Sequence, residues 1–310
     1  MFFENVYLHM FKHLFLSCVA EFQHGGHPIN MALKEVKHTP LEEIGRDLLA
    51  FNQSAYSPNT IKAYESNLNK YRNWAALQGI DIHDLPYKNI HLALFFKDIS
   101  EKTSICDGSI SSYASSLAWF HLALGYSSPM QDILVQAAIK AAKIRTGRPK
   151  NRKEPITEKM IVKICNTFTV DKSLGNLRFI LSCLMQLHAF LRSSDLLKIR
   201  REHLTVHKKH FALFIESSKT DKIRRGATLL VHKNSENKLL CPLNFLNLYL
   251  ERTKMLKISD KFIFRRIEKI HSTEKLSKIN KPITYSCLRT ILLQKLTSLG
   301  YEASKFGLHS

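Results

Sequence analysis

The chain is short of acidic residues, and this shortage narrows what it can bind. Asp and Glu number 26 against 46 Lys and Arg, which gives a formal charge of +20 and a pI near 9.7. Such an excess favours a polyanionic partner. The basic residues run through both halves of the chain rather than gathering beside one amphipathic helix, so nucleic acid is favoured over a membrane surface.

Paired cysteines and long apolar runs are also missing. The six cysteines are scattered singly without Cys-x-x-Cys spacing, which is typical of reduced thiols inside a cell. No segment reaches the ~18 unbroken apolar residues of a membrane span. The longest apolar stretch, 7–20, is interrupted by Lys12 and lacks the basic start and cleavage site of a signal peptide. We expect a soluble nuclear or cytoplasmic protein with no membrane partner.

With 310 residues and 45% hydrophobic content, the chain is long enough for two ordinary domains. After an N-terminal extension (1–40), residues 41–144 predict a helical bundle. Its clearest helix opens at Ser57-Pro58, an N-cap followed by a first-turn proline, and ends at Gly79. The other expected helices cover 41–51, 88–99 and 107–124, and a last one starts at Ser128-Pro129.

A basic stretch, RTGRPKNRK at 145–153, has no apolar periodicity and predicts a linker over 145–156. Its side chains suit contacts with DNA phosphates, and the candidates are Arg145, Arg148, Lys150, Arg152 and Lys153. The Gly147-Arg148-Pro149 core resembles a minor-groove AT-hook; a solvated tether and a nuclear import signal are the alternatives.

Residues 157–310 predict a second domain with a small sheet. Helices are expected at 157–166, 174–191, 193–200, 242–255 and from Thr284 or Ser286 to 299. Between them, 203–206, 210–216 and 227–232 alternate or are β-branched and predict three antiparallel strands. The fold class is therefore mainly α with a small antiparallel sheet (α+β).

Arg192 lies where a long apolar helix meets a short amphipathic one. A charge at a packed helix end needs an anion or a carboxylate partner, and Asp195 can hold the guanidinium while leaving its other donors free. A salt bridge that only fixes the joint is the alternative. Lys219 follows the second expected strand and could be an ordinary solvated turn lysine, with Lys222 as the fallback candidate. His309 follows a helix that ends at Gly300.

Together these motifs resemble the tyrosine recombinase (phage integrase) family. The resemblance covers about 58–310 and includes the Ser-Pro-x-Thr-x-x-x-Tyr opening at 57–64. It implies a helical SAM-like core-binding domain and an α+β catalytic-type domain that enclose double-stranded DNA. It implies that Arg192 clamps the scissile phosphate with support from Asp195, that Lys219 protonates the leaving oxygen and that His309 assists proton transfer. No metal or other cofactor is implied. Phe190 replaces the family's usual glycine.

The family's later motifs are incomplete here. Only the start of its His-x-x-Arg box is present, and Tyr249, Tyr285 and Tyr301 all precede His309, whereas the family's nucleophile follows it. We therefore expect the chain to hold DNA, with homo-oligomers on the DNA, without cleaving it. A non-catalytic DNA-binding regulator derived from a mobile element is the alternative. A helical protein-binding or RNA-binding adaptor is less favoured, because the glycine-aromatic motifs of common RNA modules are missing.

Three histidines, His203, His207 and His210, invite a zinc interpretation. A strand followed by a turn would not hold this spacing on one face, and no cysteine or carboxylate completes a tetrahedral set. We therefore expect no metal site there.

Overall fold

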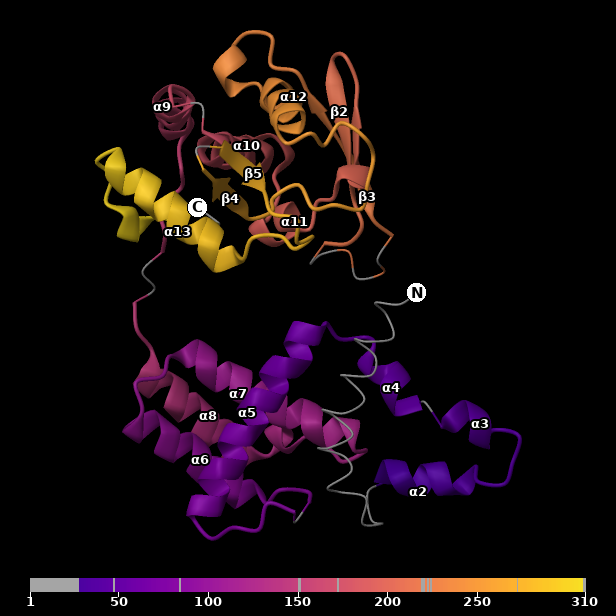
Figure 1. The fold of residues 1–310 in the computed structure, drawn as a ribbon. Helices are drawn as coiled ribbons and strands as arrows, with labels where there is room; N and C mark the ends of the chain where they lie inside the picture. The colour runs from indigo at the N-terminus through magenta and orange to yellow at the C-terminus, as the bar shows by residue number, and fades with distance from the viewer. Residues whose placement is uncertain are drawn as a thin grey trace. The chain divides into compact units, whose positions relative to one another are not determined.

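The computed structural model describes residues 28–46, 48–83, 85–149, 152–171, 173–218, 221, 223, 225–271 and 273–308. The chain divides after residue 150 into two units (Figure 1). Each unit encloses an apolar core of its own, so each is described by itself.

The described part of the N-terminal unit is helical. Its helices are α2 (Pro28–Glu35), α3 (Glu42–Gly45), α4 (Leu48–Gln53), α5 (Pro58–Leu77), α6 (Asn89–Lys102), α7 (Asp107–Ala123), the 3-10 turn η1 (Pro129–Gln131) and α8 (Ile133–Thr146). The Ser57 hydroxyl caps α5 by accepting from the Thr60 N–H, as the sequence predicts. The single helix expected at 41–51 is instead two short helices, and α8 begins after Asp132, which caps it, rather than at Ser128.

Aromatic rings fill the core of this bundle. Tyr71 lies at its centre, with ring centroids 4.7 Å from Tyr87 and 5.2 Å from Phe95. The fully buried His121 uses both ring nitrogens: Nδ1 lies 2.7 Å from the Leu117 carbonyl, and Nε2 accepts from the Tyr87 N–H at 3.1 Å. Because Nε2 is an acceptor, the neutral Nδ1–H tautomer fits this position.

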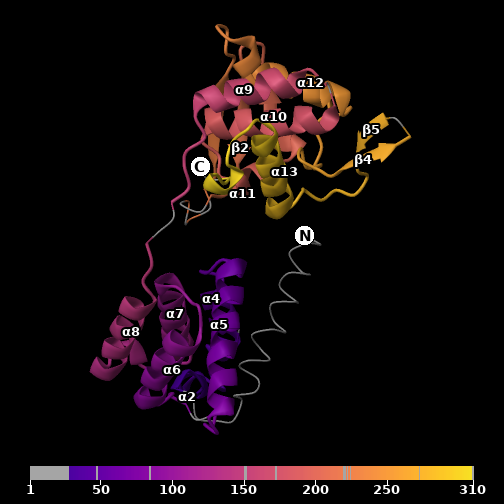
Figure 2. The same ribbon diagram turned by 90° about the vertical axis from the view of Figure 1, so that its left-hand side faces the viewer.

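The C-terminal unit is built around one buried helix. Its helices are α9 (Glu158–Thr169), α10 (Leu174–Ala189), α11 (Ser193–Leu197), α12 (Pro242–Arg252) and α13 (Tyr285–Ser298), with 3-10 turns η2 (Arg201–His203), η3 (Lys238–Leu240) and η4 (Ala303–Lys305). Most of α10 is buried, and it runs beside α9 and α12 (Figures 1 and 2). Its apolar length, free of Gly and Pro beyond the first turn, suits a core helix.

Two antiparallel sheets complete this unit. The strands β1 (Leu204–Val206), β2 (His210–Ile215) and β3 (Ala227–His232) pair in the order β1-β2-β3, which confirms the predicted sheet. The hairpin β4 (Ile267–Ile270) and β5 (Thr273–Leu276) was not predicted, because its charged residues hide the alternation. In its register Glu268 faces Lys275 and Lys269 faces Glu274, so opposite charges replace apolar pairs. The fold class, mainly α with small antiparallel sheets, is confirmed.

Among the described helices, none is both long and apolar enough to cross a membrane.

Candidate functional site

The joint between α10 and α11 places Arg192 at the surface. Helix α10 ends at Ala189, and Phe190 turns the chain in the left-handed conformation (φ 50°, ψ 36°) with its ring 92% exposed. Leu191 then returns to the core, and Arg192 is the N-cap residue of α11. Glycine is the residue that adopts left-handed backbone without strain. The joint therefore has a physical use for glycine at position 190, and Phe190 keeps the same turn.

The guanidinium of Arg192 is held loosely. Its Nη1 lies 3.9 Å from Oδ2 of Asp195, and the two side chains are 41% and 9% exposed. The Arg192 carbonyl accepts from the N–H groups of Asp195 and Leu196, both at 2.9 Å, so the backbone is fixed although the side chain is not. A long, partly exposed ion pair contributes little to stability. Among the described residues Arg192 has no other side-chain hydrogen bond or ion pair, so within that part of the chain the remaining donors of its fork can bind an external anion.

Ser193 ties the joint to the end of the described chain. Its buried hydroxyl donates to the Leu308 carbonyl at 3.2 Å and accepts from Gln186 Nε2 at 3.2 Å. Gln186 also donates to the Leu308 carbonyl, at 3.3 Å. The segment that leads into His309 therefore runs beside Arg192.

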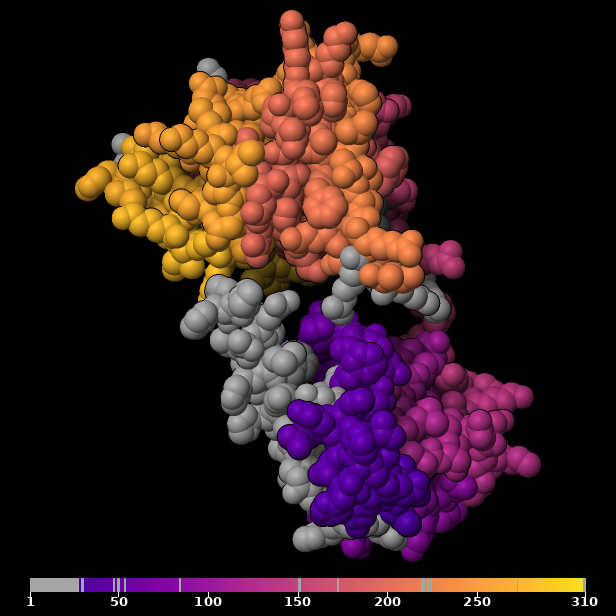
Figure 3. All heavy atoms as spheres, turned by 90° about the vertical axis from the view of Figure 1, so that its right-hand side faces the viewer, coloured from indigo at the N-terminus to yellow at the C-terminus, as the bar shows by residue number. Residues whose placement is uncertain are grey.

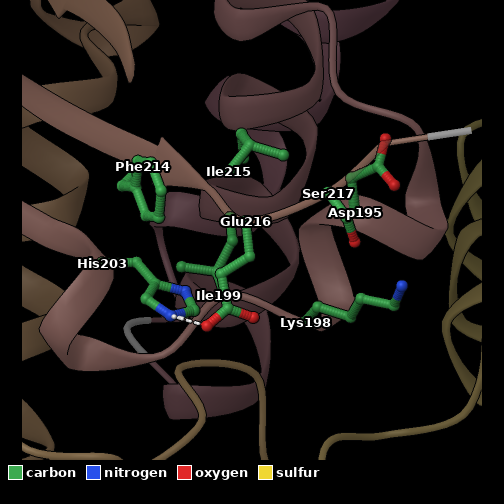
Figure 4. A pocket seen from close by; sticks show the side chains of 8 residues that line it. All are labelled: Asp195, Lys198, Ile199, His203, Phe214, Ile215, Glu216 and Ser217. Carbon is green, nitrogen blue, oxygen red and sulfur yellow. Dashed lines mark ion pairs between the residues drawn. The ribbon is translucent and has the colours of Figure 1, made fainter. Parts of the chain in front are cut away.

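A pocket next to the joint brings in the end of β2. It is lined by Asp195, Lys198, Ile199, His203, Phe214, Ile215, Glu216 and Ser217 (Figure 4). Asp195 and Lys198 come from α11 and its C-cap, and Phe214 and Ile215 from β2. The chain leaves the pocket at Ser217 and continues through Ser218 toward Lys219. Strand β2 and the residues after it, up to Ser217, therefore end beside the carboxylate that faces Arg192.

His203 fixes the opposite wall of this pocket. Its Nε2 lies 3.3 Å from Oε1 of Glu216, and its Nδ1 accepts from the Arg200 N–H at 3.2 Å (Figure 4 shows the ion pair). Because Nδ1 is an acceptor, the ring proton of neutral His203 lies on Nε2, the nitrogen that faces Glu216. His203 therefore contacts Glu216, the residue just after β2, and does not join His207 and His210. Within the described residues no group of three or more His, Cys, Asp or Glu is arranged to hold a metal ion.

Three of the predicted site residues, Lys219, His309 and the fallback Lys222, lie outside the described residues. The structure brings together what surrounds them: Arg192 and Asp195, the Ser217 end of β2, and Leu308. Sequence reasoning missed Gln186, Ser193 and Lys198. For Gln186 and Ser193 no local pattern could have revealed the bond to Leu308, which lies 115 residues beyond Ser193. Lys198 could have been suspected from the sequence, because it lies three residues after Asp195, a spacing that places two side chains on the same side of a short helix.

The basic linker is partly occupied by contacts inside the protein. Arg145 lies in the last turn of α8 rather than in the linker, and Lys150 is outside the described residues. Arg148 and Arg152 are exposed. The ammonium of Lys153 instead donates to the Ser304 carbonyl.

The neighbouring residue continues this contact. The Glu154 N–H donates to the Lys305 carbonyl at 2.8 Å, and the two side chains form an ion pair at 3.7 Å. The end of the linker is thus bonded to the segment that leads to Leu308.

Comparison with known proteins gives one significant curated relative. The chain is 22% identical over 262 residues to an integrase/recombinase, a xerD homolog, of Selenomonas ruminantium; the match covers 83% of this chain and 72% of the relative. No family model matches. This similarity confirms the resemblance indicated by the motifs.

Two solved structures of the site-specific recombinase XerH are also similar. The post-cleavage complex with a palindromic difH substrate has 12% identity and a TM-score of 0.45, and the match covers 81% of this chain and 65% of that one. The pre-cleavage complex with difH has 13% identity and a TM-score of 0.39, with 84% and 80% covered. The chain thus spans just under two thirds of the first of these.

Proposed function

We propose that this chain, a member of the tyrosine recombinase family by its sequence similarity, binds double-stranded DNA and holds a backbone phosphate at the joint of α10 and α11. The supporting observation is the convergence at this joint. A half-exposed arginine with one distant carboxylate lies where the end of β2 and the segment up to Leu308 meet. Three parts of the chain, far apart in sequence, reach one point on the surface.

The chemistry of the joint fits a phosphodiester. A guanidinium fork can donate two parallel hydrogen bonds to phosphate oxygens, and Asp195 keeps Arg192 near the required orientation without occupying all of its donors. In this proposal Lys219 and His309 contact the same phosphate. The family resemblance implies that the lysine protonates the leaving oxygen as its bond to phosphorus breaks in cleaving members, and that the histidine assists proton transfer there. These two roles rest on the family resemblance together with the positions of Ser217 and Leu308.

The net charge supplies the long-range part of binding. A charge of +20 attracts nucleic acid of any base sequence. Phosphates that are neutralised by the protein release their counterions, so affinity for DNA falls steeply as the salt concentration rises. The exposed linker arginines Arg148 and Arg152 add phosphate contacts, as do Arg145 at the end of α8 and Lys150. More than one copy binds along the same DNA in this proposal.

The test compares two arginines of equal exposure. Arg192→Ala should weaken binding to a duplex about tenfold and lower the slope of log affinity against log salt by about 0.9, as expected for one lost phosphate contact. Arg200→Ala is the matched control: Arg200 is 39% exposed and pairs with Glu202 at 3.5 Å, and its guanidinium lies over the Phe262 ring. Gel-shift titrations at several salt concentrations measure both quantities.

Thermal unfolding of the same variants decides between the two interpretations of Arg192. Because its ion pair is long and partly exposed, Arg192→Ala should change the free energy of unfolding by less than about 1 kcal/mol. A large loss of stability with unchanged DNA affinity would show that the contact with Asp195 is structural only. Affinity that does not depend on salt would overturn the proposal of DNA binding itself.

A further inference from the structure

A second basic cluster lies at one end of the three-stranded sheet. His210 of β2 and His232 of β3 are cross-strand partners, and His207 precedes the turn into β2. The ring centroids of His207 and His210 are 4.5 Å apart with planes at 27°, and those of His210 and His232 are 5.7 Å apart. The three rings form one continuous group, which we call the histidine row.

The histidine row lies on the outer face of the sheet. Phe211 and Val231, next along β2 and β3, are buried in the core, so by alternation His210 and His232 project from the other side. Exposed lysines surround the row: Lys208 and Lys209 in the turn and Lys233 after β3. In the described part of the chain none of these six residues takes part in an ion pair. Their charges are therefore not neutralised within the described protein.

The backbone holds these side chains in place. The His207 N–H donates to the His210 carbonyl at 2.9 Å and closes the turn. The Lys233 N–H donates to the Lys209 carbonyl at 2.9 Å, which extends the pairing of β2 and β3 past their last register pair. Both sides of the cluster are thus fixed by the sheet, and little ordering is needed when a ligand binds.

The histidine row is separate from the candidate site. In the register of β2 and β3, His210 and His232 form the first pair, whereas Ile215 and Ala227, next to the turn that contains Lys219, form the last. Five residue steps at ~3.4 Å each separate the two ends of the strand by about 17 Å. No residue of the histidine row lines the pocket beside Asp195. Figure 3 faces these strands, with the β1–β2 turn at the upper end.

We propose that the histidine row and its three lysines form a second phosphate-binding site, one whose affinity rises as the imidazoles take up protons. Two protonated rings 4.5 Å apart repel each other, and an anion bound across them offsets this repulsion. Proton uptake and phosphate binding are therefore coupled, and each favours the other. This site goes beyond the proposed phosphate clamp at Arg192 and does not depend on it.

The surrounding charges support this coupling. Besides the three lysines, the segment after β3 contributes Glu236 and Lys238, both exposed. The helices α10 and α12 pack against β3 from the core side, and the ionisable groups in their last turns are His188, Glu251 and Arg252. Glu236 is the one carboxylate in the described segments 204–215 and 227–240, so the positive charge is opposed weakly.

The first test uses the unmodified chain. Histidine Cε1–H resonances are followed by NMR from pH 8 to pH 5 with and without inorganic tripolyphosphate, and single His→Gln variants assign them. With the probe, the titration midpoints of His207, His210 and His232 should move to higher pH. His91, which lies on α6 in the other unit, should not respond. Midpoints that are unchanged by the probe overturn the proposal.

The second test measures affinity by calorimetry. The variant H207Q/H210Q/H232Q keeps polar side chains of similar size but cannot be protonated, and H91Q is the control. The unmodified chain should bind tripolyphosphate about tenfold more tightly than the triple variant at pH 5.5 and about equally at pH 8, within the usual range of coupling between two binding events. H91Q should behave as the unmodified chain. If the unmodified chain and the triple variant bind tripolyphosphate equally well at pH 5.5 as well as at pH 8, the proposal is overturned.

Duplex DNA as the ligand identifies the source of the phosphate. If the same acid-dependent difference is found with DNA, the second site binds the nucleic-acid backbone; if it is found only with tripolyphosphate, the site serves small phosphate compounds. Arg192→Ala provides the separation from the first site, because it should weaken DNA binding at both pH values while the difference due to the histidines remains.

Discussion

Arg201 and Arg192 belong to the same unit, yet their surroundings are opposite. Arg201 is 7% exposed and donates to the carbonyls of Met255, Leu204 and Leu256 at 2.8, 2.7 and 3.0 Å. Arg192 is 41% exposed and has one carboxylate at 3.9 Å. Burial lowers the pKa of Arg201, which remains a cation because backbone dipoles replace its water. An arginine whose Nε, Nη1 and Nη2 all donate to the backbone holds the fold, and an exposed one with a single distant partner can hold a ligand.

The comparison extends to a second buried guanidinium. Arg265 is 5% exposed and donates to the carbonyls of Phe262 and Ser277 at 3.1 and 2.7 Å. Its own carbonyl accepts from Arg178 at 2.6 Å. These arginines fix loops that have no regular hydrogen-bond ladder. Arg201 and Arg265 are buried and donate to the protein itself, so they are poorly placed to contact DNA, although each would count as a basic residue in a sequence-based estimate of DNA contacts.

The largest expected effect is a loss of stability when the buried Arg201 is replaced. Arg201→Met removes the side-chain hydrogen bonds to three carbonyls and should lower the free energy of unfolding of the C-terminal unit by about 3 kcal/mol. Arg200→Met, next to it but exposed, should change it by less than about 1 kcal/mol. Urea unfolding followed by circular dichroism measures both. Similar losses of unfolding free energy in the two variants would show that the buried Arg201 contributes no more to stability than the more exposed Arg200.

Replacing Ser193 measures how much its hydrogen bonds stabilise the joint between α10 and α11, for comparison with the loops bound by Arg201 and Arg265. Ser193→Ala removes the hydroxyl that joins Gln186 to Leu308 and should reduce stability by about 1 to 2 kcal/mol. Amide hydrogen exchange over 303–308 should become faster. The exposed Ser194, whose hydroxyl donates to Asp195, is the control, and Ser194→Ala should leave exchange in that segment unchanged.

His121 carries the comparison into the N-terminal unit. Burial lowers the pKa of its imidazole, so below about pH 6.5 the unfolded chain binds a proton that the folded chain does not. Stability of this unit should therefore fall as the pH falls, by up to about 1.4 kcal/mol per pH unit. Thermal melts between pH 5 and 8 measure it. A slope that remains in His121→Gln, or disappears in His91→Gln, would assign it to another group.

Phe190 should give the smallest change, and in the opposite direction. Phe190→Gly relieves left-handed strain but adds freedom to the unfolded chain, so a net stabilisation of about 0.5 to 1 kcal/mol is expected. Val170, an exposed residue at the end of α9 with right-handed backbone, is the matched control, and Val170→Gly should destabilise. Destabilisation by both variants would show that the Phe190 ring makes a needed contact.

Local chemistry made most helices predictable. Ser57, Thr157 and Thr284 each accept from the N–H three residues later, as their sequence positions indicate. The sheet was predictable because its core-facing residues alternate. The hairpin β4–β5 was not, since its two central pairs, Glu268 with Lys275 and Lys269 with Glu274, are charged and interrupt the apolar alternation.

The candidate site was predictable only in part. Arg192 and Asp195 could be found because they are three residues apart on one helix start. The bonds of Ser193 to Leu308 and of Lys153 to Ser304 join segments more than a hundred residues apart, and one sequence contains no pattern that pairs them. The histidine row was not predicted, because spacing along the sequence links His203 with His207 and His210, whereas in space His232 lies beside His210.

The hydrogen bond between Ser193 and Leu308 also determines when the joint can form during synthesis of the chain. A ribosome adds about 5 to 20 residues per second, so the 115 residues that separate the two take roughly 6 to 23 s to synthesise. During that interval α10 and the turn after it can form, but the carbonyl that completes the joint does not yet exist. The surface around Arg192 can therefore be completed only after Leu308 has been added to the growing chain.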